Sequence, residues 1–328
     1  MLYYNTYQSP QEAGDNKLKL LRFALIGLIL GVLFTKIAIA DSPKVVVDIA
    51  PTYSLVAQVM KGIGQPDLLV KLGASPHEHA MRPSDAKSLE SANLIFWVSR
   101  HLTPWLENAM PALVKNAEVI ELLKTRNTTV LPYRKGATFD LQSFEHGNDE
   151  EHENHNHEGV NPHGWLSPKN SIGWLYIIAE KLSDIDPNNA ESYLENADRG
   201  RIKIEKAISE TEVLLKQFRD TRFVVFHDAY QYFEDYFGVL ATGAISMSDA
   251  SAPGPARISE IRKTIDELNV TCVFSEPQFN PALLDSAIGG TNAKAAIIDS
   301  LGSQLLLDAD FYPKLLKTIG ESIASCSP

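Results

Sequence analysis

Short runs of apolar, mostly β-branched residues alternate along the chain with longer stretches of helical periodicity. Nearly every position in these runs is apolar, which is typical of strands covered on both faces in a parallel sheet. The runs form two groups of four: residues 45–49, 68–72, 94–98 and 119–122, then 223–226, 243–246, 270–274 and 296–298. The pattern predicts an α/β protein with two lobes, each with a four-stranded parallel sheet flanked by helices.

Helical periodicity fills the spaces between these runs, for example at 84–92, 104–114, 229–236, 257–268 and 311–324. A longer helical stretch, from about Pro187 to Phe218, separates the two groups of strands. One apolar stripe runs along it, formed by Tyr193, Ala197, Ile204, Ile208, Thr211, Leu215 and Phe218. Asp186-Pro187 is a good helix start. The stretch is either one long helix linking the lobes or two helices with a break near Gly200.

The first 40 residues have the pattern of a secretory signal. Basic residues at Lys17, Lys19 and Arg22 precede an apolar stretch, and residues 38–40 form an Ala-x-Ala cleavage site. The apolar stretch is short for a membrane span, which needs roughly 20 residues. No cysteine lies near the cleavage site, so a lipid anchor is not expected. We expect a mature protein that starts at Asp41 and is free in the periplasm.

The net charge of the chain limits the classes of partner that it is expected to bind. It has 30 basic and 41 acidic residues; residues 1–40 hold four and two of these, which leaves 26 and 39, a net charge of −13. An acidic surface argues against nucleic acid and anionic membrane as partners. It suits a protein that attracts cations, and we expect that protein to be a monomer.

One segment, residues 142–159, is polar and rich in histidine and acid. It cannot bury a core and is expected to be a mobile insertion in the first lobe. His146, His152, His155 and His157 lie in it and are candidates for weak, secondary metal binding. The alternative is a solubilising tract with no such role.

The only two cysteines are Cys272 and Cys326. In an exported protein they suggest one disulfide that ties the C-terminal tail to a strand. Two unrelated buried thiols are the alternative.

Three histidines lie where a metal site could form. His77 follows the second predicted strand, His227 ends the first strand of the second lobe, and His163 precedes a helix expected to begin near Pro168. Asp299 ends the last strand. Ligands of open parallel sheets bind beyond the carboxyl ends of the strands, so these side chains can face one cleft. Three imidazoles and a carboxylate suit Zn²⁺, whereas Mn²⁺ favours more oxygen ligands.

Six motifs together carry a resemblance to a known family. The chain resembles the zinc-binding solute receptors of bacterial ABC importers, the ZnuA type within the cluster A-I metal receptors. The motifs span the mature chain in the family's order, at residues 73–79, 82–85, 161–168, 226–230, 275–279 and 298–302.

The resemblance implies two α/β lobes, a long linking helix, metal in the cleft between the lobes and a disulfide in the second lobe. It implies the ligands His77, His163 and His227, and zinc, because manganese and iron relatives have a carboxylate at the position of His227. Some zinc members use a Glu just before the first His, where this chain has Pro76. The fourth ligand is then Asp299, water or His79, and for His79 a solvent-facing side chain is the stronger expectation.

The function implied is a high-affinity receptor that delivers Zn²⁺ to an ABC permease, with no enzymatic activity. The expected division is a signal peptide at 1–40, a first lobe at 41–186, a linking helix at 187–220 and a second lobe at 221–328. One alternative is a zinc hydrolase with an open three-His site and Glu78 or Glu276 as the base. The other is a metal-binding adhesin, as some relatives are described.

Overall fold

Two parallel four-stranded sheets organise the chain. The computed structural model describes residues 42–134, 138–139, 159–246 and 254–326. The first sheet has the order β2-β1-β3-β4 and the second β6-β5-β7-β8, and all neighbours are parallel. The strands of the first sheet are β1 (Val45–Val47), β2 (Asp67–Leu68), β3 (Leu94–Trp97) and β4 (Glu118–Glu121). Those of the second are β5 (Phe223–His227), β6 (Ala241–Ser246), β7 (Cys272–Ser275) and β8 (Lys294–Ile297). All eight predicted strands are confirmed, with shifts of a few residues at their ends.

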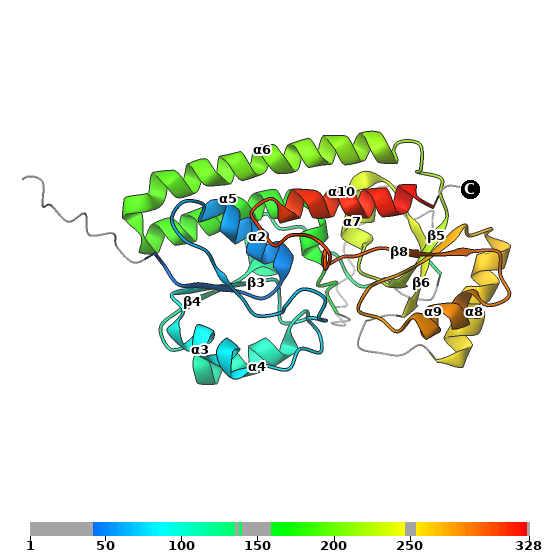
Figure 1. Ribbon diagram of the computed structural model, residues 1–328, viewed down its shortest axis with the longest axis horizontal. Coiled ribbons are helices and arrows are strands. Elements are labelled where there is room, and N and C mark those ends of the chain that lie inside the picture. Colours follow the sequence, from blue (N-terminus) through cyan, green and yellow to red (C-terminus); the bar gives the residue numbers. More distant parts are fainter. Residues whose placement is uncertain (1–41, 135–137, 140–158, 247–253, 327–328) are drawn as a thin grey trace, which may run out of the picture. The chain divides into compact units, whose positions relative to one another are not determined.

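Helices cover both faces of the first sheet. Figure 1 shows α3 (Pro83–Ser91) and α4 (Pro104–Leu113) on one side and α2 (Ala50–Val59) and α5 (Pro168–Ile185) on the other. The alternation of side chains along β1 explains this arrangement. Val45 and Val47 belong to the cluster that includes helix α5, whereas Val46 belongs to the cluster that includes α3 and α4.

The second sheet carries α7 (Gln231–Phe237), α8 (Pro255–Glu267) and α9 (Pro281–Ile288). Five of the described α-helices begin with proline as their first residue: α3, α4, α5, α8 and α9. Proline suits this position because its missing N–H has no partner there in any helix. These prolines fix where the chain leaves each strand end and turns back along the sheet.

The long helical stretch is a single helix. A short 3₁₀ turn (Pro187–Asn189) leads into α6 (Ala190–Leu215), whose 26 residues span about 39 Å at 1.5 Å per residue. The predicted stripe is buried up to Leu215, and Phe218 lies beyond the helix end. Gly200 does not break the helix but lets it approach its neighbours. A Cβ there would lie 2.8 Å from Cγ of Gln58 and 3.0 Å from Cδ1 of Leu175.

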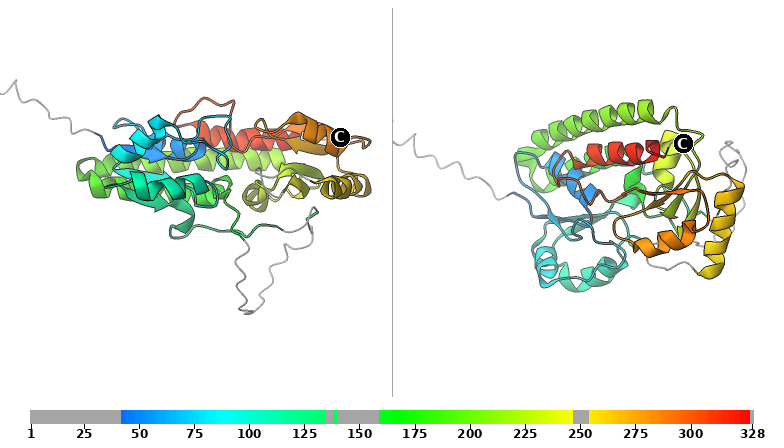
Figure 2. Two further views of the ribbon diagram at one scale, coloured as in Figure 1. Left: turned by 90° about the horizontal axis from the view of Figure 1, so that it is seen from below. Right: turned by 45° about the vertical axis from the view of Figure 1, so that its right-hand side comes forward.

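The last helix, α10 (Phe311–Ala324), connects the two lobes. It runs alongside α6 and also contacts α2 of the first lobe (Figures 1 and 2). The backbone N–H of Tyr312 donates to Oγ of Ser54 at 3.0 Å. One hydrophobic cluster contains side chains from both sheets and from α6 and α10. The two sheets therefore share a core, which restrains their relative motion.

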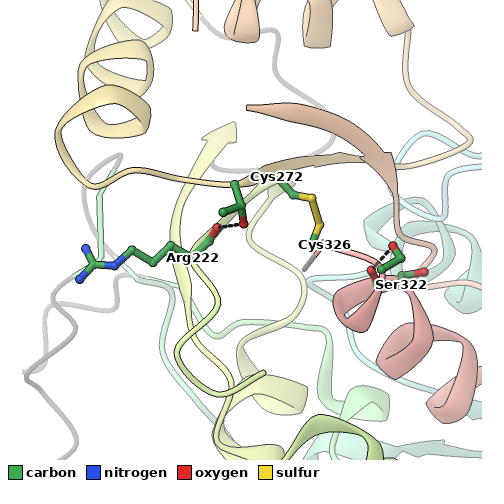
Figure 3. Close-up of a disulfide and its surroundings, with 6 residues drawn as sticks. Arg222, Cys272, Ser322 and Cys326 are labelled. Carbon is green, nitrogen blue, oxygen red and sulfur yellow. Dashed lines mark hydrogen bonds between the residues drawn. A yellow bond between two sulfur atoms is a disulfide. The ribbon is translucent and has the colours of Figure 1, made fainter. Parts of the chain in front are cut away.

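A disulfide joins Cys272 to Cys326, with a Cα–Cα distance of 5.7 Å. It ties the start of β7 to the chain just after α10, as Figure 3 shows. The expected single disulfide is confirmed, and the alternative of two free thiols is excluded.

Helix α2 was not among the helices expected from the sequence. Nine of its ten residues are buried, so it has no polar face and no amphipathic period. The leader at 1–40 and the histidines of the insertion, His146, His152, His155 and His157, lie outside the described residues. In the part of the chain that is described, no helix is long and apolar enough to cross a membrane.

Candidate metal site

The candidate ligands are carried by the carboxyl ends of both sheets. His227 is the last residue of β5, Asp299 lies two residues beyond β8, and His77 is in the loop that follows β2. His163 lies just before a 3₁₀ turn (Gly164–Leu166) that leads into α5. This is the edge at which open parallel sheets bind ligands.

The structure brings three imidazoles together. The ring centroids of His77 and His163 are 5.8 Å apart, and those of His163 and His227 are 5.1 Å apart. Nε2 of His163 lies 3.2 Å from Nε2 of His227. Two imidazoles on one tetrahedral Zn²⁺, with Zn–N of about 2.0–2.1 Å, have their nitrogens about 3.3 Å apart.

The side-chain donor atoms of the candidate ligands do not form a complete coordination sphere in this structure. Among the residues that the structure describes, no group of three or more His, Cys, Asp or Glu side chains has its donor atoms in metal-binding positions. His163 and His227 already have the spacing of two ligands, and the His77 ring lies next to His163. Metal binding would draw the three donors onto one centre.

Asn161 orients His163. Its Oδ1 lies 2.7 Å from Nδ1 of His163 and also accepts the backbone N–H of that residue at 3.1 Å. An amide oxygen at Nδ1 favours the tautomer with its proton on Nδ1, which leaves the lone pair of Nε2 for a metal. Asn161 is fully buried, so this orientation is fixed by packing.

A carboxylate oxygen of Glu276 lies beside Nδ1 of His227. This oxygen, Oε1, lies 2.5 Å from Nδ1, and both side chains are buried. The other oxygen of Glu276, Oε2, accepts from Oγ of Ser300 and from Nε2 of Gln278, each at 2.9 Å. From the sequence, Glu276 was expected only as a member of the motif at 275–279 and as a candidate hydrolytic base, so its place beside His227 was not predicted. The available signal was its place: it directly follows β7, which neighbours the strand that ends in His227.

His163 is held in the neutral form that binds metals. Burial lowers its pKa well below the usual 6.5, and its neighbours His227 and His77 lower that pKa further. A protonated imidazole cannot bind a metal. The site therefore keeps this ligand ready at neutral and mildly acidic pH.

Asp299 is engaged by the backbone of the loop that follows it. Its Oδ1 accepts the N–H groups of Leu301 and Gly302 at 2.9 and 2.8 Å. Its Oδ2 accepts from the N–H and the hydroxyl of Ser303, both at 2.6 Å. A carboxylate has about four lone-pair sites, and these four contacts use them. To bind a metal, Asp299 would have to release one contact, and the freely rotating Ser303 hydroxyl is the easiest to give up.

His79 faces neither solvent nor the other imidazoles. Its Nε2 lies 3.1 Å from Oδ2 of Asp85, its ring centroid lies 4.7 Å from that of Trp105, and its side chain is 8% exposed. The expectation of a solvent-facing His79 was wrong. The reason is that Asp85, which Arg82 also binds, offers a buried acceptor that the sequence did not reveal.

Trp105 and Ser75 hold the His77 loop. Nε1 of Trp105 donates to the carbonyl of Pro76 at 2.8 Å, and the backbone N–H of His77 donates to Oγ of Ser75 at 3.2 Å. These contacts come from the first lobe. His163 is tied to the second lobe through its neighbour Trp165, whose Nε1 donates to the carbonyl of Ser300 at 2.9 Å.

Comparison with known proteins identifies the fold first. A crystal structure of ZnuA superposes with a TM-score of 0.72 at 21% identity, covering 88% of this chain and 100% of the other. A mutant structure of the laminin-binding adhesin Lmb from Streptococcus agalactiae superposes with a TM-score of 0.70 at 24% identity, covering 87% and 99%. These likenesses establish a two-lobed α/β protein with a long helix between the lobes.

The sequence comparisons identify the family. A family profile described as "Zinc-uptake complex component A periplasmic" matches residues 45–326. The high-affinity zinc uptake system protein ZnuA of Brucella abortus (strain 2308) is 37% identical over 307 residues, covering 87% of this chain and 91% of that protein. The chain belongs to the ZnuA family, and the resemblance drawn from its motifs is confirmed.

Proposed function

We propose that this protein captures Zn²⁺ in the periplasm and delivers it to an ABC permease in the membrane. The observation that carries the proposal is the pair of Nε2 atoms of His163 and His227, 3.2 Å apart, each on a ring whose Nδ1 lies beside an oxygen of a buried side chain. Membership of the ZnuA family supports it.

The proposed ligands are His77, His163 and His227, with Asp299 completing a tetrahedral set after it releases the Ser303 hydroxyl. A water molecule is the alternative fourth ligand. Three imidazoles favour Zn²⁺ over Mn²⁺, because neutral nitrogen donors suit zinc and manganese prefers oxygen. The four histidines of the insertion, at positions 146, 152, 155 and 157, are proposed as a secondary, weaker zinc site.

The proposed maturation and organisation follow the sequence. Residues 1–40 act as a signal peptide, and the mature monomer starts at Asp41. We divide it into a first lobe at 41–186 with the insertion at 142–159, a linking helix at 187–220 and a second lobe at 221–328. The helix α10 contributes to the core of both lobes, which supports transfer by small movements around the ligands rather than by a wide hinge opening.

A receptor fits the geometry better than a hydrolase does. A hydrolase would need a carboxylate free to act as a base near a metal-bound water. Both oxygens of Glu276 are engaged, one near His227 and one with Ser300 and Gln278. Glu78 is exposed. Adhesion is a second candidate, favoured by the structural likeness to the laminin-binding adhesin.

A chelator-competition titration of the mature protein with Zn²⁺ and Mn²⁺ tests the proposal. The same titration is made on a protein lacking residues 144–159 and on the His163→Ala and His227→Ala variants. We expect one tight Zn²⁺ equivalent that survives the deletion, far weaker Mn²⁺ binding, and loss of tight binding in both alanine variants. Loss of tight binding on deletion alone would place the primary site in the insertion and refute the proposed ligand set.

A further inference from the structure

A buried cluster of charges lies beside the candidate metal site, and the proposed function does not account for it. Arg134 belongs to the segment between β4 and the 3₁₀ turn before α5, yet its partners are in the second lobe. Its guanidinium binds both oxygens of Asp228, and it donates to Oε2 and Oε1 of Glu234 at 2.7 and 2.9 Å. The Asp228 and Glu234 side chains are 0% and 1% exposed, and that of Arg134 is 16% exposed.

Each partner of Arg134 belongs to an element that shapes the site. Asp228 directly follows His227 at the end of β5. Glu234 is in α7, and its Oε2 also accepts the N–H of Ala241, the first residue of β6, at 3.0 Å. Arg134 therefore joins the end of β5, the helix after it and the start of the neighbouring strand.

The segment of Asp228 and Gln231 in the second lobe also binds Asn161, which lies two residues before His163. Nδ2 of Asn161 donates to the backbone carbonyl of Asp228 at 3.3 Å and to Oε1 of Gln231 at 3.0 Å. The Oδ1 of Asn161 orients His163. Asp228 thus links the two ligand segments. Its side chain binds Arg134, its backbone continues directly from His227, and its carbonyl accepts the hydrogen bond from Asn161.

Removing the guanidinium would leave the buried carboxylates of Glu234 and Asp228 without their shared cation, although the charge of Arg257 still acts on Asp228. Such groups must gain water or protons, or move apart, because an uncompensated buried charge is strongly unfavourable. The movement available to Asp228 is a shift of the turn at residues 227–229. That shift would carry His227 away from His163 and spoil the spacing of the two Nε2 atoms.

We propose that Arg134 is a positioning residue for the metal site, which holds Asp228 so that His227 and His163 stay at the spacing of two zinc ligands. This inference rests on the ligand set of the proposed function. It assigns a role to a residue that touches neither the metal nor any imidazole. The ring of Phe139 covers the Arg134 guanidinium, with 3.7 Å between the ring centroid and Cζ of Arg134.

The test compares Arg134→Gln and Arg134→Lys with Arg201→Gln. Arg201 is a matched control: it also binds a carboxylate, Glu205, and a tyrosine hydroxyl, but it lies on α6 away from the strand ends. The measurements are Zn²⁺ affinity by chelator competition and the visible d–d absorption of the Co²⁺-substituted protein. The absorption reports the coordination geometry and would not respond to a purely structural role.

We expect Arg134→Gln to weaken Zn²⁺ binding by about 10-fold, the lower end of the effect typical of outer-shell partners, because Arg134 acts on the ligands only through Asp228. The Co²⁺ spectrum should change in band position or intensity. Arg134→Lys keeps the charge but cannot bridge two carboxylates in a fork, so an intermediate loss of affinity is expected. Arg201→Gln should match the wild type in both measurements.

A folded Arg134→Gln protein with wild-type affinity and an unchanged Co²⁺ spectrum would overturn the inference. If that variant does not fold, Arg134→Lys decides: wild-type values for both measurements overturn the inference, and a loss of affinity with an altered spectrum supports it. The His163→Ala and His227→Ala variants separate the two claims. Tight binding retained in them would refute the ligand set and the inference together, whereas loss in them with no effect at Arg134 would refute the inference alone.

Discussion

The carboxylate of Glu276 offers the sharpest test of how this site holds a metal. We consider its replacement by glutamine, which keeps the shape and removes the charge, and by alanine, which removes the acceptor as well. Oε1 of Glu276 lies 2.5 Å from Nδ1 of His227, and both side chains are buried, so no water can readily replace the contact.

The size of the effect follows from this one contact. Loss of an outer-shell partner of a metal ligand typically weakens metal binding by about 10- to 100-fold. Each tenfold change in affinity corresponds to about 1.4 kcal/mol, so removing the contact should cost about 1.4–2.8 kcal/mol of binding free energy. Glutamine can still accept the Nδ1–H through its carbonyl, so Glu276→Gln should fall near the lower end and Glu276→Ala near the upper end.

The assay is a chelator-competition titration at pH 7, with folding checked by circular dichroism. Glu267→Gln is the matched control, because Glu267 pairs with Lys263 on the exposed surface of α8. If folded Glu276→Ala binds Zn²⁺ within twofold of the wild type, then Glu276 does not orient a ligand.

Four further outcomes are expected. Burial keeps the pKa of His163 well below 6.5, so at most about two of the three imidazoles compete with Zn²⁺ for protons between pH 6.5 and 5. The log Kd for Zn²⁺ should therefore rise by at most about two for each unit by which the pH falls in this range. A measured slope of three would contradict this. The same lowered pKa means that unfolding takes up a proton, so the metal-free protein should lose stability as the pH falls below about 6.5, measured by urea unfolding. Replacing Cys272 and Cys326 by serine should cost about 2–4 kcal/mol of unfolding free energy and leave Zn²⁺ affinity unchanged, since the disulfide lies at the opposite end of β7 from Glu276; an affinity loss in the folded variant would show that the disulfide also shapes the site. Asp299→Ala should weaken Zn²⁺ binding, whereas Ser303→Ala should strengthen it slightly by removing one of the two contacts to Oδ2 of Asp299. Wild-type affinity for Asp299→Ala would make water the fourth ligand.

Much of this architecture could be predicted from the order of residues alone. Eight apolar runs were enough to indicate eight strands, because strands of a parallel sheet are rich in apolar residues. Five of these strands are buried throughout, whereas β2, β4 and β8 also carry exposed residues. The stripe along α6 predicted a helix between the lobes, because a helix packed on one side needs apolar side chains at intervals of three or four. His77 and His227 were singled out because a residue that follows or ends a parallel strand lies at the ligand-binding edge of the sheet, and His163 was singled out by its motif before the helix at Pro168. The disulfide could be predicted because the chain has two cysteines, and cysteines of an exported protein tend to pair.

What the sequence left open depended on contacts between distant segments. Helix α2 has no periodicity because it is buried on every side, and Gly200 could be understood as a close approach rather than a break only once its neighbours were in place. Neither the place of Glu276 beside His227 nor the pairing of His79 with Asp85 follows from spacing along the chain. Local sequence determined which groups stand at the strand ends, because strand and helix periods are local properties. Only the tertiary packing, within each lobe and between the lobes, decided which of those groups are brought together, because hydrogen bonds and ion pairs depend on distances in space.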